Sequence, residues 1–495
     1  MIDYDVCVIG GGPAGYAAAM RAIDYGKKVV LIEKEKLGGA GLYDGVLSSK
    51  TMWEYSQTVL NAKKHINSGN LKLDVQWKDM KKTIQEAIFE RSFQLSCHLK
   101  ILQEEDKKHL FKLERGKATL IDKHSIQIEG KKKTKIITAE NIVLATGSKP
   151  RMLPHIDIDE KTILSSDGIT HLDDFPKSMV ILGAGVIGCE FASIFANIGK
   201  TKVYIIDKQD RILPFEDEDI SQLISKNLSR KGVHIHKNSQ LVKMEIIDGE
   251  VEYTLEDEQG KQEIFKVEKA LVSIGRVPNT INLGLENLKI NLGPRGHIID
   301  ENTRTNIPNI YAVGDLTSHM ALVNVAELEG RHAIEQMYDK PEPLSYKNIS
   351  SIMFLDPEVA TVGMNEQQAR SKDLDYRLVK LDYSTVARAI AMRQTEGFIK
   401  ILVTDDDEMR ILGMRALGAH ASSIIQAVAL LISMNKGIDT LVNLIHPHPS
   451  IIEGVQEAVR MLRGNPIFKS AIFNDKLKCY RFSDGEITRL DNLLD

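Results

Sequence analysis

Two glycine-rich segments carry the clearest chemical signal in this chain of 495 residues. The first, GGGPAG, follows an apolar run and leads through an alanine-rich stretch and a second apolar run to Glu33. The second, GAGVIG, has the same surroundings and leads to Asp207. Such glycines allow a tight turn, close approach of the backbone to a pyrophosphate and close packing of helix on strand. We therefore predict two dinucleotide sites, with glycines Gly10, Gly12, Gly15, Gly183, Gly185 and Gly188.

Each segment needs a strand, a helix and a second strand to hold it, because the pyrophosphate lies at a helix N-terminus and the acidic residue reaches a ribose. Between the two units we expect helices from Thr51 to Glu105, interrupted by a polar insert near NSGNLKLDVQW. A charged, β-rich stretch then leads to the buried strand of NIVLATGSKP. After Gly199, strands and one helix alternate, and the segment from KGVHIH onward is typical of strands and hairpins.

The pattern changes after Tyr346. The runs EVATVGM, GFIKILV and RILGMRALG indicate antiparallel strands, and we predict a long helix from Ser422 to Lys436 and another near Ile451–Arg463. Residues 471–495 are rich in charge and are predicted to be an added tail with a hairpin.

Composition excludes several classes of protein. A hydrophobic content of 43%, a charged content of 27% and a net charge of -4 indicate a globular protein with no long-range attraction to nucleic acid or anionic membrane. The apolar stretch at residues 179–199 contains spaced glycines and Glu190, so we expect a strand and a packed helix rather than a membrane span.

The cysteines and the N-terminus predict the compartment. The four cysteines show no CxxC or similar spacing, which predicts neither a metal site nor a disulfide framework. The opening MIDYDVCVIGGG is acidic and enters a strand at once, with no room for a cleavable signal. We expect a cytoplasmic protein.

The ordered motifs GGGPAG, GG followed by SSK, ATGSKP, GAGVIGCE, GRVPN, YAVGD and HPHPSIIE span nearly the whole chain. In this order they resemble those of the pyridine nucleotide-disulfide oxidoreductase family. The resemblance implies an α/β fold with two Rossmann-like domains, for FAD and NAD, and a C-terminal α+β dimerisation domain. The implied ranges are 1–150 and 281–345 for the FAD-binding parts, 151–280 for the NAD(P)-binding domain, 346–470 for the dimerisation domain and 471–495 for the tail.

The same resemblance assigns the cofactors. The first glycine segment would hold FAD, with Glu33 on its adenosine ribose and Asp315 near the ribityl and pyrophosphate groups. The second would hold the nicotinamide cofactor, with Asp207 at its ribose. A carboxylate there bonds the free 2′-OH of NAD and repels the 2′-phosphate of NADP, so NAD(H) is expected over NADP(H). The further cofactor-binding residues that the motifs imply are Gly147, Gly275, Arg276 and Gly314.

Four residues match the family's catalytic groups. Lys50 matches the lysine at flavin N5 and Glu190 the carboxylate that pairs with it. His448 and Glu453 match an acid–base pair that crosses a homodimer interface into the partner subunit's active site. Two interpretations of this second pair stay open: it protonates an acceptor, or it only stabilises the interface.

The segment GGAGLYDGVLSSK departs from the family pattern GGTCxNxGCxPSK. The two cysteine positions are Gly41 and Val46, and the proline is Ser48. The family's redox disulfide cannot form at these positions. We therefore expect a homodimeric flavoprotein oxidoreductase in which hydride passes from NADH to FAD and on to a small-molecule, non-disulfide acceptor, such as a second nicotinamide or a quinone. The alternatives are a dihydrolipoyl dehydrogenase proper and a non-catalytic scaffold that binds FAD and NAD.

Overall fold

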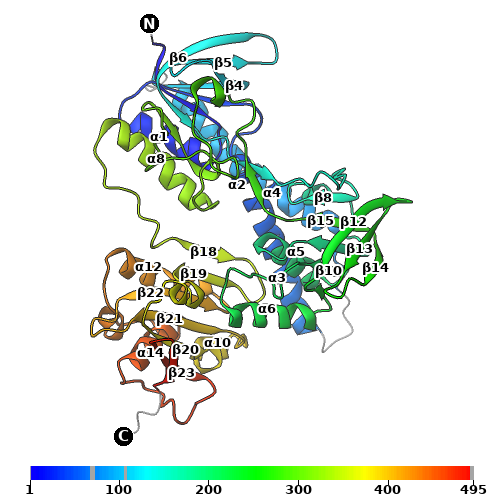
Figure 1. Ribbon diagram of the computed structural model, residues 1–495, viewed down its shortest axis with the longest axis vertical. Helices are drawn as coiled ribbons and strands as arrows, with labels where there is room; N and C mark the ends of the chain where they lie inside the picture. The colour runs from blue at the N-terminus through cyan, green and yellow to red at the C-terminus, as the bar shows by residue number, and fades with distance from the viewer. Residues whose placement is uncertain (1, 67–72, 105–108, 491–495) are drawn as a thin grey trace. The chain divides into compact units, whose positions relative to one another are not determined.

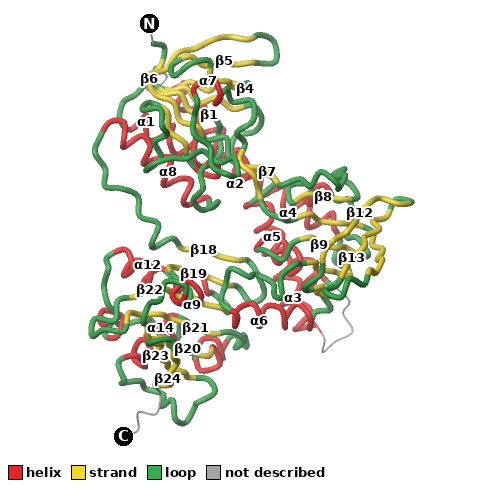
Figure 2. The backbone as a smooth tube through the Cα atoms, viewed as in Figure 1, coloured by secondary structure: helices red, strands yellow, loops and turns green. Residues whose placement is uncertain are grey.

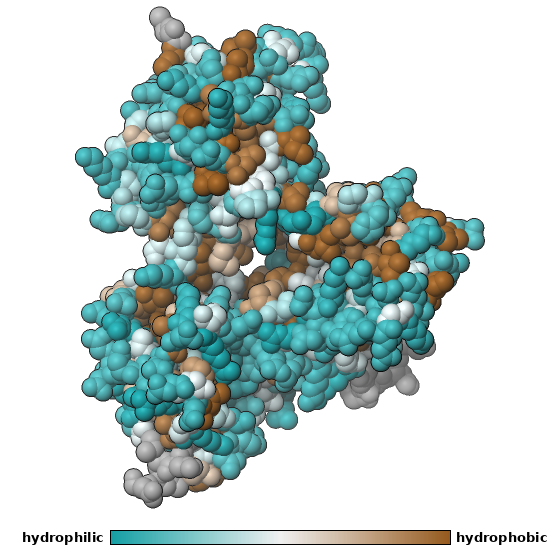
Figure 3. All heavy atoms as spheres, viewed as in Figure 1, coloured by the Kyte–Doolittle hydropathy of each residue, from teal (hydrophilic) through white to brown (hydrophobic). Residues whose placement is uncertain are grey.

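The computed structural model describes residues 2–66, 73–104 and 109–490. These residues form two compact units: residues 1–183 with 241–344, and residues 184–240 with 345–495. The former is the first unit and the latter is the second unit (Figure 1). Hydrophilic residues cover most of the visible face of both, in line with the charged composition (Figure 3).

The first unit contains the strands around the first glycine segment. Strand β1 (Tyr4–Ile9) lies between β2 (Val29–Glu33) and β6 (Thr134–Leu144), and all three are parallel. Strand β3 (Phe111–Arg115) extends the sheet beyond β2, and β17 (Ile310–Ala312) pairs with β6. Every residue of β2 is buried, as expected of a parallel strand covered on both faces.

Two helices cover one side of this sheet. Helix α1 (Pro13–Asp24) packs along α8 (Val323–Tyr338), and both contribute alanines to one apolar cluster with β1 and β2 (Figure 1). An antiparallel ribbon of β4 (Lys117–Leu120) and β5 (Ser125–Glu129) continues from the outer part of β6.

The helices predicted between Thr51 and Glu105 are confirmed as α3 (Val46–Ile66) and α4 (Trp77–Glu104), preceded by the short α2 (Gly39–Leu42). Part of the predicted insert, residues 67–72, lies outside the described residues. The indole of Trp77 donates to the carbonyl oxygen of Leu172 at 2.5 Å and packs edge-on against Phe175.

The first unit also holds three parallel strands that belong to the second glycine segment: β8 (Ile163–Ser165), β9 (Ser178–Leu182) and β15 (Lys269–Val272). The predicted hairpins follow as β12 (Gln240–Ile247), β13 (Glu250–Glu256) and β14 (Gln262–Val267). A short antiparallel pair, β7 (Ser148–Pro150) and β16 (Arg276–Pro278), brings two of the family motifs together.

The second unit begins with α5 (Val186–Ile198), β10 (Lys202–Ile206), α6 (Glu218–Arg230) and β11 (His234–His236), with β10 and β11 parallel. Within the described residues, no helix is long and apolar enough to cross a membrane. Residues 179–199 fold mainly as β9 and α5.

The rest of the second unit is built on an antiparallel sheet in the order β18-β19-β22-β21-β20-β23-β24 (Figure 2). The predicted strands are confirmed as β19 (Val359–Gly363), β21 (Phe398–Thr404) and β22 (Ile411–Leu417). Strand β18 (Ser350–Met353) forms one edge of this sheet, and β20 (Tyr376–Asp382) lies between β21 and β23. The second predicted helix is α14 (Ile452–Leu462).

The long helix predicted from Ser422 to Lys436 is wrong in its extent. The structure has α11 (Ala421–Ile424) and α12 (Gln426–Ser433) instead. The helix ends early because Asn435 takes a left-handed conformation, with φ of 52°, and the N–H of Lys436 bonds back to the carbonyl oxygen of Leu431. Asparagine is one of the few residues that adopts this conformation readily at a helix end.

The hairpin predicted in the tail is confirmed. Strands β23 (Leu477–Ser483) and β24 (Glu486–Arg489) are joined by Asp484 and Gly485, which both have positive φ, as a tight hairpin turn requires. Because β23 pairs with β20, the tail extends the main sheet of the second unit rather than standing apart from it.

Candidate functional site

The first glycine segment is shaped for an anion at the start of α1. A side-chain carbon at Gly10, which has φ of 107°, would lie 2.3 Å from the carbonyl oxygen of Ala145, and one at Gly15 would lie 1.9 Å from that of Gly10. One at Gly12 would meet nothing within 4 Å. Helix α1 begins with Pro13 and has no side-chain cap, so its first N–H groups are available to a phosphate.

Glu33 ends β2 beside this segment. Its carboxylate accepts hydrogen bonds from the backbone N–H of Gly11 and of Glu35, each at 2.7 Å. These bonds hold a buried, acceptor-only group next to the glycine segment, where a ribose diol can donate to it. The arrangement fits the adenosine half of a dinucleotide.

The second glycine segment repeats this construction. A side-chain carbon at Gly183 would lie 2.6 Å from the carbonyl oxygen of Ser273, while one at Gly185 would meet nothing within 4 Å. Helix α5 starts after Gly185 without a side-chain cap, and Gly188 is buried within it. The carboxylate of Asp207 accepts from the N–H of Ala184 at 2.7 Å, as Glu33 does from Gly11.

A polar network joins three of the family motifs in the first unit. The hydroxyl of Ser148 donates to Asp315 at 2.6 Å and accepts from Arg276 at 2.9 Å, and Arg276 forms an ion pair with Asp167 at 2.8 Å. The structure therefore connects Arg276 and Asp315 through Ser148. Their predicted roles in cofactor binding stay predictions. The flanking Gly147 and Gly275 both have positive φ and open space at the side-chain position. Sequence reasoning missed Asp167, because no motif surrounds it.

Gly314 connects Asp315 to α1. A side-chain carbon at Gly314 would lie 3.3 Å from Cβ of Ala14, in the first turn of α1, and its N–H donates to Glu329 at 2.6 Å. Glu329 is 1% exposed and its second oxygen lies 3.1 Å from Nδ1 of His319. Neither Glu329 nor His319 was predicted. Asp315 thus lies near the start of the helix that the first glycine segment opens.

The segment where the family has its redox cysteines is closely packed at one position and open at the other. A side-chain carbon at Gly41 would lie 2.7 Å from Cγ of Pro13. Val46, which begins α3, has an exposed fraction of 42%. Ser48 is buried, and its hydroxyl donates to the carbonyl oxygen of Gly45 at 3.3 Å.

Lys50 and Glu190 lie in different units, and their predicted pairing stays a prediction. Lys50 is part of α3 in the first unit. Glu190 is buried on α5 in the second unit, and its carboxylate accepts from the N–H of Phe354 at 2.9 Å.

The predicted pair of His448 and Glu453 is formed. Nδ1 of His448 lies 2.7 Å from Glu453, whose second oxygen accepts from the N–H of Ser450 at 2.8 Å. Burial opposes ionisation of Glu453, but the Ser450 N–H and the imidazole together hold its pKa below the usual value. The rest of the His448 side chain is exposed within this chain. Its catalytic role stays a prediction.

All four cysteines are free. Cys7 and Cys189 are fully buried, and burial raises the pKa of both thiols. Cys479 is buried in β23, and Cys97 lies on α4. The two raised pKa values keep Cys7 and Cys189 as unreactive thiols.

Comparison with known proteins agrees with this geometry. Residues 4–330 match the family described as pyridine nucleotide-disulphide oxidoreductase, and residues 349–459 match its dimerisation domain, which supports a homodimer. A dihydrolipoyl dehydrogenase of Bacillus subtilis is 33% identical over 468 residues, covering 94% of this chain and 98% of the relative. A dihydrolipoyl dehydrogenase of Geobacillus stearothermophilus is 34% identical over 467 residues, covering 94% of this chain and 97% of the relative.

Two solved structures are similar over almost their full length. LpdA from Mycobacterium tuberculosis has a TM-score of 0.84 and 27% identity, with 92% of this chain and 99% of that chain covered. The HOCl-induced flavoprotein disulfide reductase RclA from Escherichia coli has a TM-score of 0.81 and 26% identity, with 93% and 100% covered. The chain belongs to the pyridine nucleotide-disulphide oxidoreductase family.

Proposed function

We propose that this protein is a homodimeric, FAD-dependent oxidoreductase that takes hydride from NADH and delivers the electron pair to an acceptor other than a disulfide. Members of the family bind FAD and NAD(H). The observation that carries the proposal is the pair of residues Gly41 and Val46 at the positions of the family's redox cysteines. Without a thiolate at these positions, thiol–disulfide exchange has no nucleophile.

The two glycine segments would bind the two cofactors, and the domain ranges given above are part of this proposal. The free N–H groups at the start of α1 would hold the FAD pyrophosphate, and Glu33 and Asp315 would bind its sugar groups. The uncapped start of α5 would hold the pyrophosphate of NADH. Asp207 favours NADH because its carboxylate repels a 2′-phosphate.

Bound FAD would supply the site that accepts hydride and returns two electrons. We assign to Lys50 the stabilisation of negative charge at the flavin, because a cation near N1 or N5 favours hydride arrival. Glu190 would orient Lys50. His448, held by Glu453, would give a proton to the acceptor from the partner subunit, and an interface role alone is the other interpretation of this pair.

The proposed acceptor is a flat molecule that takes two electrons without thiol chemistry, such as a second nicotinamide or a quinone. Pro13 packs closely against Gly41, so the absence of a side chain at Gly41 leaves no space there for the acceptor. The acceptor would instead approach the flavin past the exposed side chain of Val46.

The test is an anaerobic titration of the FAD-loaded protein with NADH, followed by flavin absorbance. We expect bleaching to be complete at one equivalent, with no long-wavelength band of a thiolate next to flavin. Uptake of two equivalents with such a band would reveal a dithiol and overturn the proposal. A flavin that NADH does not bleach would favour the non-catalytic scaffold.

A dihydrolipoyl dehydrogenase proper is the second candidate, and the names of the two curated relatives favour it. Reduction of NAD by dihydrolipoamide distinguishes the two functions. We expect no turnover with dihydrolipoamide under conditions in which a quinone or a nicotinamide analogue is reduced. Steady turnover of several per second with dihydrolipoamide would establish the second candidate.

A further inference from the structure

A cavity of about 290 Å³ lies in the second unit, in residues that no part of the proposed reaction uses. Its wall is formed by the end of α14, the loop that follows, β23, one residue of β20, and Leu490 directly after β24. All but one of its lining residues follow residue 459, where the match to the dimerisation domain ends. The exception is Arg377. The tail, residues 471–495, contributes Ala471, Cys479, Arg481 and Leu490 to this lining.

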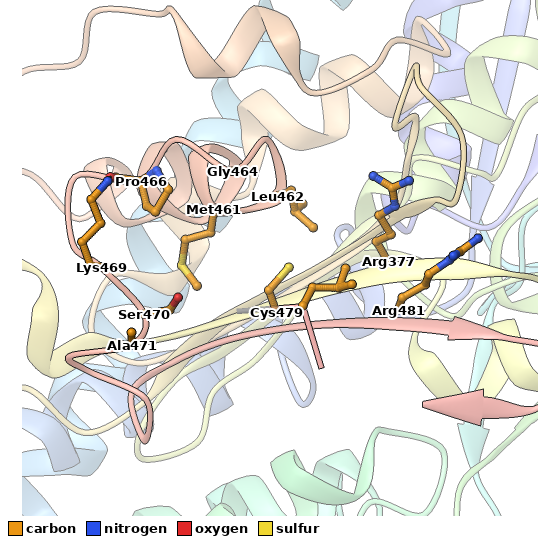
Figure 4. A pocket seen from close by; sticks show the side chains of 11 residues that line it. Arg377, Met461, Leu462, Gly464, Pro466, Lys469, Ser470, Ala471, Cys479 and Arg481 are labelled. Atoms are coloured by element: carbon orange, nitrogen blue, oxygen red, sulfur yellow. The ribbon is translucent and has the colours of Figure 1, made fainter. Parts of the chain in front are cut away.

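The lining has a charged end and an apolar middle. Figure 4 shows the side chains of Arg377 and Arg481 together at one end, with Met461, Leu462 and Cys479 between them and Lys469. Among the described residues that line the cavity, three are cations, Arg377, Lys469 and Arg481, and none is a carboxylate.

The two arginines leave one positive charge unbalanced. They are direct partners across β20 and β23, and each donates from Nε at 2.7 Å to the carboxylate of Asp405, whose side chain is 4% exposed. Burial opposes ionisation of Asp405, but the two guanidinium groups hold its pKa below the usual value, so it carries one negative charge between two positive ones. Because both bonds use Nε, the terminal nitrogens of the guanidinium groups can donate to a ligand.

We propose that this cavity binds a small amphiphilic anion, a carboxylate on an unbranched apolar chain. The carboxylate lies against Arg377 and Arg481, since a planar guanidinium matches its geometry and one negative charge neutralises the excess. The apolar chain lies along Met461, Leu462 and Leu490. Small-molecule sites begin at roughly 300 Å³, so the cavity fits a chain of medium length and no large cofactor.

Isothermal titration of the full FAD-loaded chain with octanoate tests the proposal. We expect one site, at which affinity falls by up to about fourfold for each methylene removed from octanoate toward acetate. Octylamine, which has the same apolar chain and the opposite charge, is expected not to bind. An affinity independent of chain length, or equal binding of octylamine, would overturn the proposal.

Two variants decide whether the arginines hold the anion. Arg481→Gln keeps the bond from Arg377 to Asp405, and we expect it to weaken octanoate binding by about tenfold, the loss of one charge-assisted hydrogen bond. Arg463→Gln is the matched control, because Arg463 pairs with Asp439 and does not line the cavity. Flavin absorbance and the melting temperature confirm that both variants fold. Unchanged binding in Arg481→Gln, an equal loss in both variants, or tighter binding of inorganic phosphate than of octanoate would refute the assignment.

Discussion

Gly41→Cys introduces the cysteine that the family pattern has at this position. The packing around Gly41 predicts that this substitution destabilises the first unit. The new Cβ would lie 2.7 Å from Cγ and 3.4 Å from Cδ of Pro13, and 3.7 Å from Cγ2 of Val323. Ordinary contacts between carbon atoms are about 3.5–4.0 Å, so the proline ring has to move by roughly an ångström. Pro13 is the first residue of α1, which limits how far it can shift.

Overpacking of this kind costs about 1–3 kcal/mol. The exchange of glycine for a residue with a side chain inside a short helix offsets part of it, by at most about 1 kcal/mol. Central values of about 2 kcal/mol for the cost and about 0.5 kcal/mol for the offset leave a net loss of about 1.5 kcal/mol in the free energy of unfolding. The melting temperature falls by roughly 2–4 °C for each kcal/mol lost. Because α1 opens the predicted FAD site, the affinity for FAD should fall as well.

Thermal unfolding and titration of the apoprotein with FAD measure the two effects. Val46→Cys is the matched control, since the side chain at Val46 is exposed and a change there should stay within about 0.5 kcal/mol. If Gly41→Cys has the same melting temperature and the same FAD affinity as the parent, Pro13 can shift without cost, and the argument from packing is refuted.

Four further predictions concern the cofactor residues and the titrating pairs. Gly12→Ala and Gly185→Ala each place a methyl group in open space, so the stability of the apoprotein should change by less than about 0.5 kcal/mol. Gly12→Ala should weaken FAD binding at least about tenfold, and Gly185→Ala should raise the KM for NADH at least about tenfold. Asp207→Ser removes a carboxylate that repels a 2′-phosphate, and steady-state kinetics should show the ratio of kcat/KM for NADPH over NADH rising at least about tenfold; an unchanged ratio would contradict the assignment of this ribose site. Glu453→Gln should lower the free energy of unfolding near neutral pH only. The folded pKa of Glu453 lies below the ordinary 4.5, so the stabilisation by its carboxylate is present above pH 4.5 and is lost as pH falls through the folded pKa. Chemical denaturation across pH 3–7 should show a stability difference between parent and variant that disappears in acid. The hydrogen bond that His319 donates to Glu329 raises the pKa of His319 above 6.5; burial opposes this shift and the charge of Asp300 adds to it. His319→Gln should therefore lose a stabilisation that is present below pH 6.5 and disappears as pH rises through the folded pKa. A stability difference between variant and parent that is constant with pH would exclude this linkage.

The parts of the fold that the sequence predicts are those whose cause is local. Both glycine segments, their strands and the acids that end them follow from spacing alone, and the structure repeats one detail, an acid accepting from a backbone N–H of the segment, at Glu33 and at Asp207. The end of α12 was missed because Asn435 can adopt either a helical or a left-handed conformation. The residues before Asn435 fit a helical pattern and do not indicate which of the two conformations Asn435 adopts.

The place of the tail depends on contacts that no local pattern contains. The turn at Asp484 and Gly485 is a strong hairpin signal, and the hairpin was predicted. The pairing of β23 with β20 joins strands about a hundred residues apart, and strand preference depends mostly on such neighbours. The same pairing brings Arg481 opposite Arg377 at one end of the cavity, so the cavity could not be predicted from composition.

The two positions that the resemblance assigns to the family's cysteines differ in their surroundings. Gly41 is closed by Pro13, whereas Val46 is exposed. A cysteine at Val46 alone would lack a partner, and a cysteine at Gly41 alone would disturb the start of α1, where the phosphate-binding N–H groups lie. Restoring the dithiol thus requires repacking of α2 against α1 in addition to two substitutions.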